Sequence, residues 1–243
     1  CTDPQLKIIC DPIDGSRGLM YGKRSAFFLA AAGPINSQTL QDMNVSVMVE
    51  LPIPKQWEFD VLWAIRGEGA VMDRYNRGYE STPVFLKPSE SRTVEGGFMS
   101  IARFCYPGKD LISRVEEKFL DRLFEEREEE YLPVFEDQYI STGGQMYELI
   151  CGHDLFTADF RASMYTHFTS LNKKQGQVCH PYDIAGLLVA QEAGVDVIDL
   201  EGKSFDCPLG TANNYDWVGF ANQHFRRQCE GLFFSILKYE IIT

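Results

Sequence analysis

The hydrophobic pattern of the first third of the chain predicts β-strands. Several short apolar runs are separated by Gly, Pro and polar residues, and 44–51 alternates apolar and polar positions. The predicted strands are residues 6–10, 25–32, 44–51, 60–65, 70–72 and 84–86. A glycine-rich turn joins 60–65 to 70–72, as is typical of a β-hairpin. These runs predict an antiparallel or mixed sheet of about four or five strands.

The rest of the chain alternates predicted helices and strands. Leu111, Val115, Phe119 and Leu123 repeat every fourth position, which indicates one apolar face of a helix. Further predicted helices cover 141–152, 181–194 and 225–239, and predicted strands cover 96–101, 158–160, 195–200 and 217–221, with 166–179 expected to be irregular. The pattern predicts an α/β protein with a single domain over 1–243, whose sub-halves 1–95 and 96–243 each contain one sheet.

Composition narrows the classes of function. The 243 residues can bury a large core, and the formal charge of −12 argues against general binding of nucleic-acid polymers. The longest apolar run, 26–33, is far shorter than a membrane span. The seven cysteines form no C-x-x-C pair, which favours reduced thiols in a cytoplasmic protein. The acidic run 125–130 is more typical of a solvated helix face than of a metal site.

The first candidate for chemistry is the hexapeptide 11–16, with the sequence Asp-Pro-Ile-Asp-Gly-Ser. The carboxylates of Asp11 and Asp14 can converge around a turn with the carbonyl of Ile13, and such oxygen ligands suit Mg²⁺. Gly15 admits a ligand close to the backbone, and free N–H groups at Ser16 suit a phosphate. The same residue types are also typical of a plain turn, so the hexapeptide alone leaves both interpretations open.

Two other stretches have alternative interpretations. Asp183 stands at the start of the predicted helix 181–194, where an aspartate commonly acts as an N-cap. Gly143 and Gly144 open the predicted helix 141–152 and either expose backbone N–H groups to a ligand or satisfy a packing requirement.

Basic residues near these stretches are candidate anion ligands. Arg161 follows the predicted strand 158–160 and is a candidate for binding a substrate anion. Arg17, Lys23 and Arg24 follow the hexapeptide and either steer an anionic substrate or are solvated loop charges.

Three motifs occur in order: Asp-Pro-Ile-Asp-Gly-Ser at 11–16, Ala-Ile-Arg-Gly-Glu-Gly-Ala at 64–70, and Pro-Tyr-Asp-Ile-Ala-Gly at 181–186 followed by Glu-Ala-Gly at 192–194. Together they resemble the inositol monophosphatase-like superfamily, which includes fructose-bisphosphatases and 3′-phosphoadenosine phosphatases. The resemblance implies a layered αβαβα sandwich. It also implies metal-dependent hydrolysis of an inositol monophosphate, a sugar phosphate or a nucleotide 3′-phosphate by a metal-activated water.

The resemblance also implies a role for each matched residue. The implied metal ligands, for two or three Mg²⁺ ions, are the side chains of Asp11, Asp14 and Asp183 and the carbonyl of Ile13. Asp14 and Ser16 are the implied catalytic residues, with the Ser16 hydroxyl orienting the attacking water. The predicted substrate-binding residues are Gly15, Ser16, Gly143, Gly144 and Arg161.

One departure from the family pattern leaves an alternative. Family members carry a Glu-Glu metal ligand pair and a water-activating acid upstream of the first motif, and this sequence contains neither. We expect that an upstream segment has been removed; the alternative is a non-catalytic relative that binds metal or phosphate. The expected partner is a small phosphorylated metabolite, not a nucleic-acid polymer or a membrane, and a homodimer is compatible with the family.

Overall fold

The computed structural model describes residues 3–125, 133–170 and 175–242. Its first sheet has six strands in sequence order, each antiparallel to its neighbour. These strands are β1 (Leu6–Asp14), β2 (Ala26–Pro34), β3 (Val45–Leu51), β4 (Glu58–Ile65), β5 (Ala70–Asn76) and β6 (Ser81–Val84). The sheet has six strands instead of the expected four or five, because β6 also pairs with β5. Strand β6 overlaps the predicted run 84–86 only at Val84, since its partner β5 extends beyond the predicted run 70–72.

The second sheet has four strands in the order β7-β8-β10-β9. These strands are β7 (Phe98–Ile101), β8 (Asp154–Asp159), β9 (Asp196–Ile198) and β10 (Trp217–Phe220). The β7–β8 pair is parallel, and the other pairs are antiparallel. Every residue of β8 and β10 is buried, as expected for strands covered on both faces.

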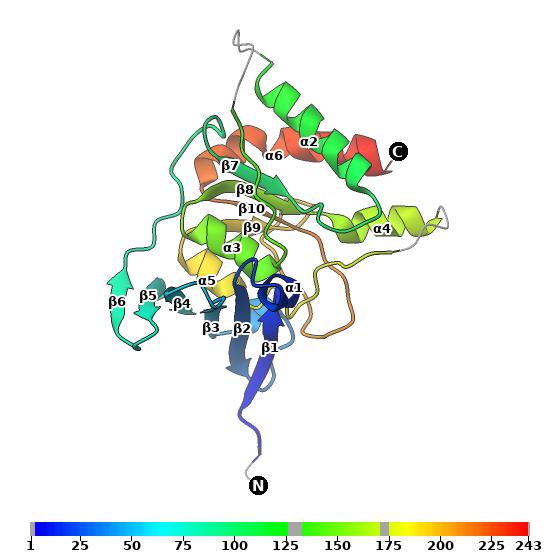
Figure 1. The fold of residues 1–243 in the computed structure, drawn as a ribbon. Coiled ribbons are helices and arrows are strands. Elements are labelled where there is room, and N and C mark those ends of the chain that lie inside the picture. The colour runs from blue at the N-terminus through cyan, green and yellow to red at the C-terminus, as the bar shows by residue number, and fades with distance from the viewer. Residues whose placement is uncertain (1–2, 126–132, 171–174, 243) are drawn as a thin grey trace.

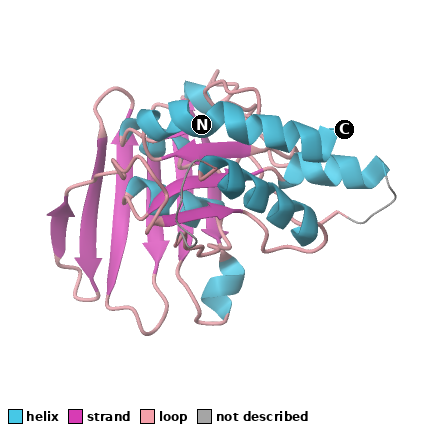
Figure 2. Ribbon diagram, turned by 90° about the horizontal axis from the view of Figure 1, so that it is seen from above, coloured by secondary structure: helices cyan, strands magenta, loops and turns pink. Residues whose placement is uncertain are grey.

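Helices separate the two sheets and cover the second one (Figure 1, Figure 2). The α-helices are α1 (Ser16–Met20), α2 (Lys109–Leu123), α3 (Thr142–Ile150), α4 (Arg161–Ser170), α5 (Leu187–Glu192) and α6 (Gln223–Leu237). Helices α3 and α5 contact strands of both sheets, and α6 packs on β10 and on α2. The mixed α/β class is thus confirmed. None of the described helices has the length and apolar character needed to cross a membrane.

The described residues supply four layers in the order sheet, helices, sheet, helices. In Figure 1 the described helices lie on one side of the six-stranded sheet. Its other face also carries exposed apolar side chains, such as Ile8, Val45 and Trp63. An apolar pattern on both faces is typical of a sheet that is covered on both sides, as in the predicted αβαβα layering.

Two predicted segments differ in the structure. The stretch 166–179 was expected to be irregular, but α4 extends to Ser170, because Met164, Tyr165 and Phe168 form a buried face at helical spacing. The predicted helix 181–194 is an α-helix only from Leu187; residues 181–186 form turns with hydrogen bonds three positions apart. Most of the acidic run lies outside the described residues.

Candidate active site

An irregularity in β1 places the first two candidate carboxylates. Asp11 pairs with Leu29 and Asp14 with Phe27, so two residues of β1 stand opposite one residue of β2. Residues three apart in a regular strand point to opposite faces, and the extra residue of this β-bulge turns both carboxylates to the buried side. The predicted turn is therefore a bulge within a continuing strand. Pro12 is tolerated there because β1 is an edge strand.

Gly15 follows the bulge, and a side chain at this position would strain the backbone. Gly15 has φ +89°, a left-handed conformation, and caps α1. A Cβ built on Gly15 would lie 2.9 Å from the Cβ of Ser141. The close approach of these two segments therefore depends on the absence of a side chain at position 15.

Replacing Gly15 by alanine should therefore lower the free energy of unfolding by about 1–3 kcal/mol, since strain and a steric contact combine. Urea denaturation followed by fluorescence measures the change. Gly210→Ala is the matched control, because Gly210 has open space around its Cα and no left-handed φ. Equal stability of the two variants would contradict this account of the turn.

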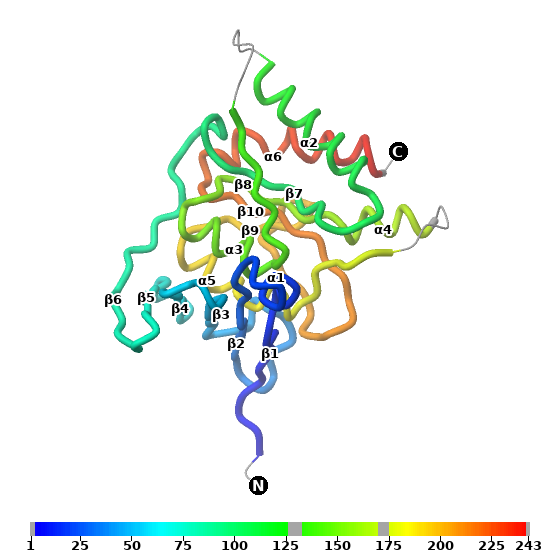
Figure 3. Tube along the Cα trace, viewed as in Figure 1, coloured from blue at the N-terminus to red at the C-terminus, as the bar shows by residue number. Residues whose placement is uncertain are grey.

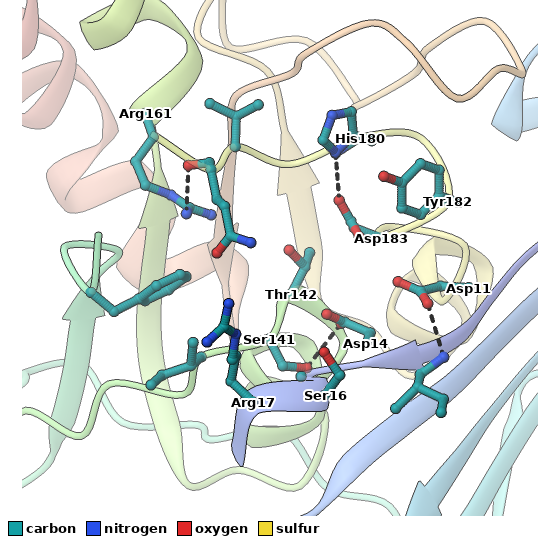
Figure 4. Close-up of a pocket in the computed structure, with 16 residues that line it drawn as sticks. Asp11, Asp14, Ser16, Arg17, Ser141, Thr142, Arg161, His180, Tyr182 and Asp183 are labelled. Atoms are coloured by element: carbon teal, nitrogen blue, oxygen red, sulfur yellow. Dashed lines mark hydrogen bonds and ion pairs between the residues drawn. The ribbon is translucent and has the colours of Figure 1, made fainter. Parts of the chain in front are cut away.

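The third carboxylate comes from the turn before α5. Asp183 accepts a hydrogen bond from the backbone N–H of His180 at 2.7 Å, and its carboxylate lies 3.1 Å from Nδ1 of the same histidine. Ligand atoms of Asp11, Asp14 and Asp183 all lie within 4.8 Å of one another. Figure 4 shows the three side chains bordering the same pocket. This arrangement could hold a metal ion.

The start of α3 holds Asp14 in place. The Ser141 hydroxyl donates to the Asp14 carboxylate at 2.9 Å, and the Gly143 N–H donates to it at 2.6 Å. The Gly144 N–H donates to Ser141 Oγ, which makes Ser141 the N-cap of α3. Sequence reasoning missed Ser141, although a serine at the first position of a predicted helix is an N-cap signal.

The two glycines of α3 therefore differ from their predicted role as substrate ligands. Their N–H groups are used by Asp14 and Ser141. A Cβ on Gly143 would lie 2.8 Å from Leu29, and one on Gly144 would lie 2.2 Å from the ring of Tyr139. The structure thus favours the packing alternative: Gly143 lets α3 approach β2 closely enough to support Asp14, and Gly144 leaves room for the Tyr139 ring.

A cavity of about 220 Å³ opens in front of the carboxylates. Predicted site residues that line it are Asp11, Ile13, Asp14, Gly15, Ser16, Arg161 and Asp183. Arg17, a sequence candidate for steering an anion, also lines it, and the structure adds Thr142, His180 and Tyr182. Ser16 and Arg17 extend from α1 toward this space (Figure 4). The His180 and Tyr182 rings stack with centroids 5.1 Å apart on the opposite wall. The cavity is therefore bordered by carboxylates on one side and by polar, aromatic and basic side chains elsewhere.

Comparison with known proteins gave no matching family model and no matching curated protein. Solved structures do match. Fructose-1,6-bisphosphatase of Leishmania major in its holo form has a TM-score of 0.65 at 12% identity, covering 93% of this chain and 69% of that chain. A hypothetical protein of Pyrococcus horikoshii with similarities to inositol-1 monophosphatase has a TM-score of 0.58 at 15% identity, covering 94% and 69%. The chain has the inositol monophosphatase and fructose-1,6-bisphosphatase fold.

A third match with this fold is a calcium-bound inositol monophosphatase family protein of Staphylococcus aureus, with a TM-score of 0.57 at 16% identity, covering 96% of this chain and 67% of that chain. The fold implied by the three sequence motifs is thus confirmed.

Within the inositol monophosphatase fold of this chain, Arg161 is committed to a buried ion pair. Its side chain is 4% exposed, and its guanidinium donates to both carboxylate oxygens of Asp159 at 2.8 and 2.6 Å. A further N–H donates to the carbonyl of Gln177 at 2.9 Å, and the guanidinium lies over the Phe104 ring. Arg161 reaches the cavity wall as predicted, but Asp159 neutralises its charge. Arg17 is the exposed cation of this cavity.

The carboxylates of Asp11, Asp14 and Asp183 lie close together in a largely buried site, where their negative charges repel one another. Burial raises the pKa of Asp14 to about 8, against hydrogen bonds from Gly143 and Ser141 that lower it, and the nearby charge of Asp183 raises it further. Burial likewise raises the pKa of Asp183 to about 6. In the described part of the chain, no lysine or arginine forms an ion pair with Asp11, Asp14 or Asp183. A hard cation with oxygen ligands fits this set, because it would remove the repulsion.

Proposed function

We propose that this chain is a metal-dependent phosphomonoesterase that hydrolyses a small phosphate monoester. The observation that carries the proposal is the convergence of three carboxylates, from β1 and from the turn before α5, on one cavity, where no lysine or arginine of the described residues pairs with them. Solved phosphatases that share the fold support the reaction class, and the calcium-bound relative supports a divalent cation.

Asp11, Asp14 and Asp183 would hold Mg²⁺, with the Ile13 carbonyl as a further ligand and two or three ions in total. Carboxylate and carbonyl oxygens are the ligands that Mg²⁺ prefers. Bound there, the ions would polarise the phosphoryl group and lower the pKa of a bound water. Ser141 and Gly143 orient Asp14 through hydrogen bonds, so that its second oxygen is left for this purpose.

The residues after the bulge would bind the phosphate. The backbone N–H groups of Gly15 and Ser16 lie at the entry to α1, and Gly15 lets the phosphate approach the main chain. The Ser16 hydroxyl would orient the attacking water. The water oxygen bonds to phosphorus, the ester P–O bond breaks, and the leaving oxygen takes a proton, which yields an alcohol and inorganic phosphate.

Phosphate release from inositol 1-phosphate, fructose 1-phosphate and adenosine 3′-monophosphate, in Mg²⁺ and in EDTA, tests the proposal. We expect release from at least one compound in Mg²⁺ and none in EDTA. Calorimetry with Mg²⁺ on the same protein distinguishes the second candidate, a metal- or phosphate-binding relative without catalysis. Metal binding without release from any compound would reject the phosphatase and support that candidate.

A further inference from the structure

The six described cysteines differ in whether a reagent from solution can reach and oxidise them. Burial raises the pKa of four of them, which are Cys151, Cys179, Cys207 and Cys229. These thiols stay protonated near neutral pH, and a protonated thiol is a poor nucleophile. The other two, Cys10 and Cys105, are exposed and partly exposed, respectively. Oxidation by a reagent in solution is therefore expected at Cys10 or Cys105.

The sulfur of Cys105 lies among hydrogen-bonding groups. Nη1 of Arg161 donates to Cys105 Sγ at 3.7 Å, and Cys105 Sγ donates to Oε1 of Gln177 at 3.8 Å. In Figure 3 the connection from β7 to α2 and the chain that follows α4 both pass the start of α4, and this brings the three residues together. Phe104 and Gln177 line the cavity in front of the carboxylates, so Cys105 lies directly behind a wall of the candidate active site.

A buried tyrosine hydroxyl near Cys105 lacks a partner. Tyr165 is 0% exposed, and its hydroxyl has no hydrogen-bond partner among the described residues. A Cβ built on Gly176 would lie 2.4 Å from this hydroxyl oxygen and 3.0 Å from the carbonyl oxygen of Tyr106. The hydroxyl therefore faces a space between the residue after Cys105 and the residue before Gln177.

The Tyr165 hydroxyl stays a hydrogen-bond donor. Burial raises the pKa of Tyr165, and the charge of Cys105 raises it further. Buried donors are nearly always satisfied, so an unpaired O–H in this place favours a site for an additional acceptor atom.

We propose that Cys105 is a modification site at which a hydroperoxide oxidises the thiol to a sulfenic acid. The added oxygen is the acceptor that the Tyr165 hydroxyl lacks, and it can also accept from Arg161, which already donates to the sulfur. The site goes beyond the proposed function and does not require it.

The oxidation step balances with the hydroperoxide as the oxidant. The thiol releases its proton, and the sulfur attacks the terminal oxygen of the hydroperoxide, which stays on the sulfur with its hydrogen. The S–O bond forms as the O–O bond breaks, so the sulfur is oxidised and the peroxide is reduced. The departing oxygen takes the released proton and leaves as water or an alcohol. Negative charge develops on this oxygen, and the donors of Arg161 and Tyr165 stabilise it.

Hydrogen peroxide together with dimedone, which reacts with sulfenic acids, tests the site on the intact folded protein. After proteolysis, mass spectrometry compares the labelling rates of the peptides that contain Cys10 and Cys105. We expect Cys105 to be labelled about tenfold faster than the more exposed Cys10, because its neighbours donate hydrogen bonds to the charge that develops. In guanidinium chloride the two rates should become similar, since unfolding separates Cys105 from these neighbours. Equal rates in the folded protein would overturn the proposal.

Tyr165→Phe removes the unpaired hydroxyl and keeps the ring. We expect the labelling rate of Cys105 to fall about fivefold, whereas the free energy of unfolding should not decrease, because the folded protein loses no hydrogen bond among its described residues. Tyr75→Phe is the matched control: Tyr75 stacks on Phe59 in the first sheet, and its replacement should leave the labelling of Cys105 unchanged. Unchanged labelling of Cys105 in Tyr165→Phe would show that the hydroxyl has no part in the oxidation and would contradict the proposal.

Discussion

Asp14→Asn should lower Mg²⁺-dependent phosphate release by roughly a thousandfold, which corresponds to about 4 kcal/mol of lost transition-state stabilisation. The amide can still accept the hydrogen bonds from Ser141 and Gly143, so the bulge and the start of α3 should keep their geometry. What disappears is the negative charge that we propose binds the cation. Initial rates at saturating Mg²⁺ measure the effect, and unchanged turnover would overturn the site assignment.

Two controls separate lost chemistry from lost folding. Asp121→Asn makes the same replacement on the exposed side of α2 and should leave turnover unchanged. In EDTA, Asp14→Asn should be more stable than the wild type, increasingly so from pH 5 to pH 8. The reason is that the pKa of Asp14 is raised to about 8 in the folded chain, so the native state binds the proton more tightly than the unfolded state and loses stability as the pH rises. Thermal unfolding at several pH values measures this difference.

Asp159→Ala should lower the free energy of unfolding by about 3–5 kcal/mol, because it leaves the buried guanidinium of Arg161 without its counter-charge. Both side chains are almost fully buried, at 4% and 0% exposure, so water cannot replace the lost partner. Chemical denaturation measures the change.

A surface pair and a double variant serve as controls for this prediction. Asp110→Ala removes a carboxylate that is 85% exposed and 3.9 Å from Arg114, and it should change stability by less than about 0.5 kcal/mol. The double variant Asp159→Ala/Arg161→Met removes both buried charges and should be more stable than Asp159→Ala alone. A double variant as unstable as the single one would mean that the loss does not come from the unpaired charge.

The strands could be predicted because they depend on local sequence, and the three carboxylates that the structure brings together are those implied by the family resemblance. Alternation of residue type marks β3, a short apolar run marks β4, and two aspartates three residues apart stand out in the motif at 11–16. Asp183 alone had the pattern of a helix N-cap. The geometry of the bulge could not be predicted, because Asp-Pro-Ile-Asp-Gly also fits a tight turn, and only pairing with β2 distinguishes the two. The sequence predicted that the helix begins at residue 181, but α5 begins at Leu187. The turns at 181–186 have hydrogen bonds three positions apart and no helical repeat of apolar residues that would distinguish them from an α-helix.

Side-chain partners were the least predictable part of the site. Arg161 was expected to bind an anion of the substrate, but its guanidinium pairs with the Asp159 carboxylate. Asp159 ends β8, a fully buried strand, and burial favours pairing of the two opposite charges. Gly143 and Gly144 were ambiguous because their surroundings, Leu29 and Tyr139, come from other elements. The contacts of these glycines with Leu29 and Tyr139 form only in the folded chain, so residue types and spacing do not predict them.

The contact between Asp14 and α3 also has a kinetic consequence. The Gly143–Asp14 hydrogen bond joins positions 129 residues apart, whereas the hairpins of the first sheet join neighbouring strands. Contacts between distant positions form late because the intervening chain must first be ordered. We therefore expect a bound cation to retard unfolding rather than to accelerate folding, since the three carboxylates proposed to bind it come together only after the two sheets have assembled around α3.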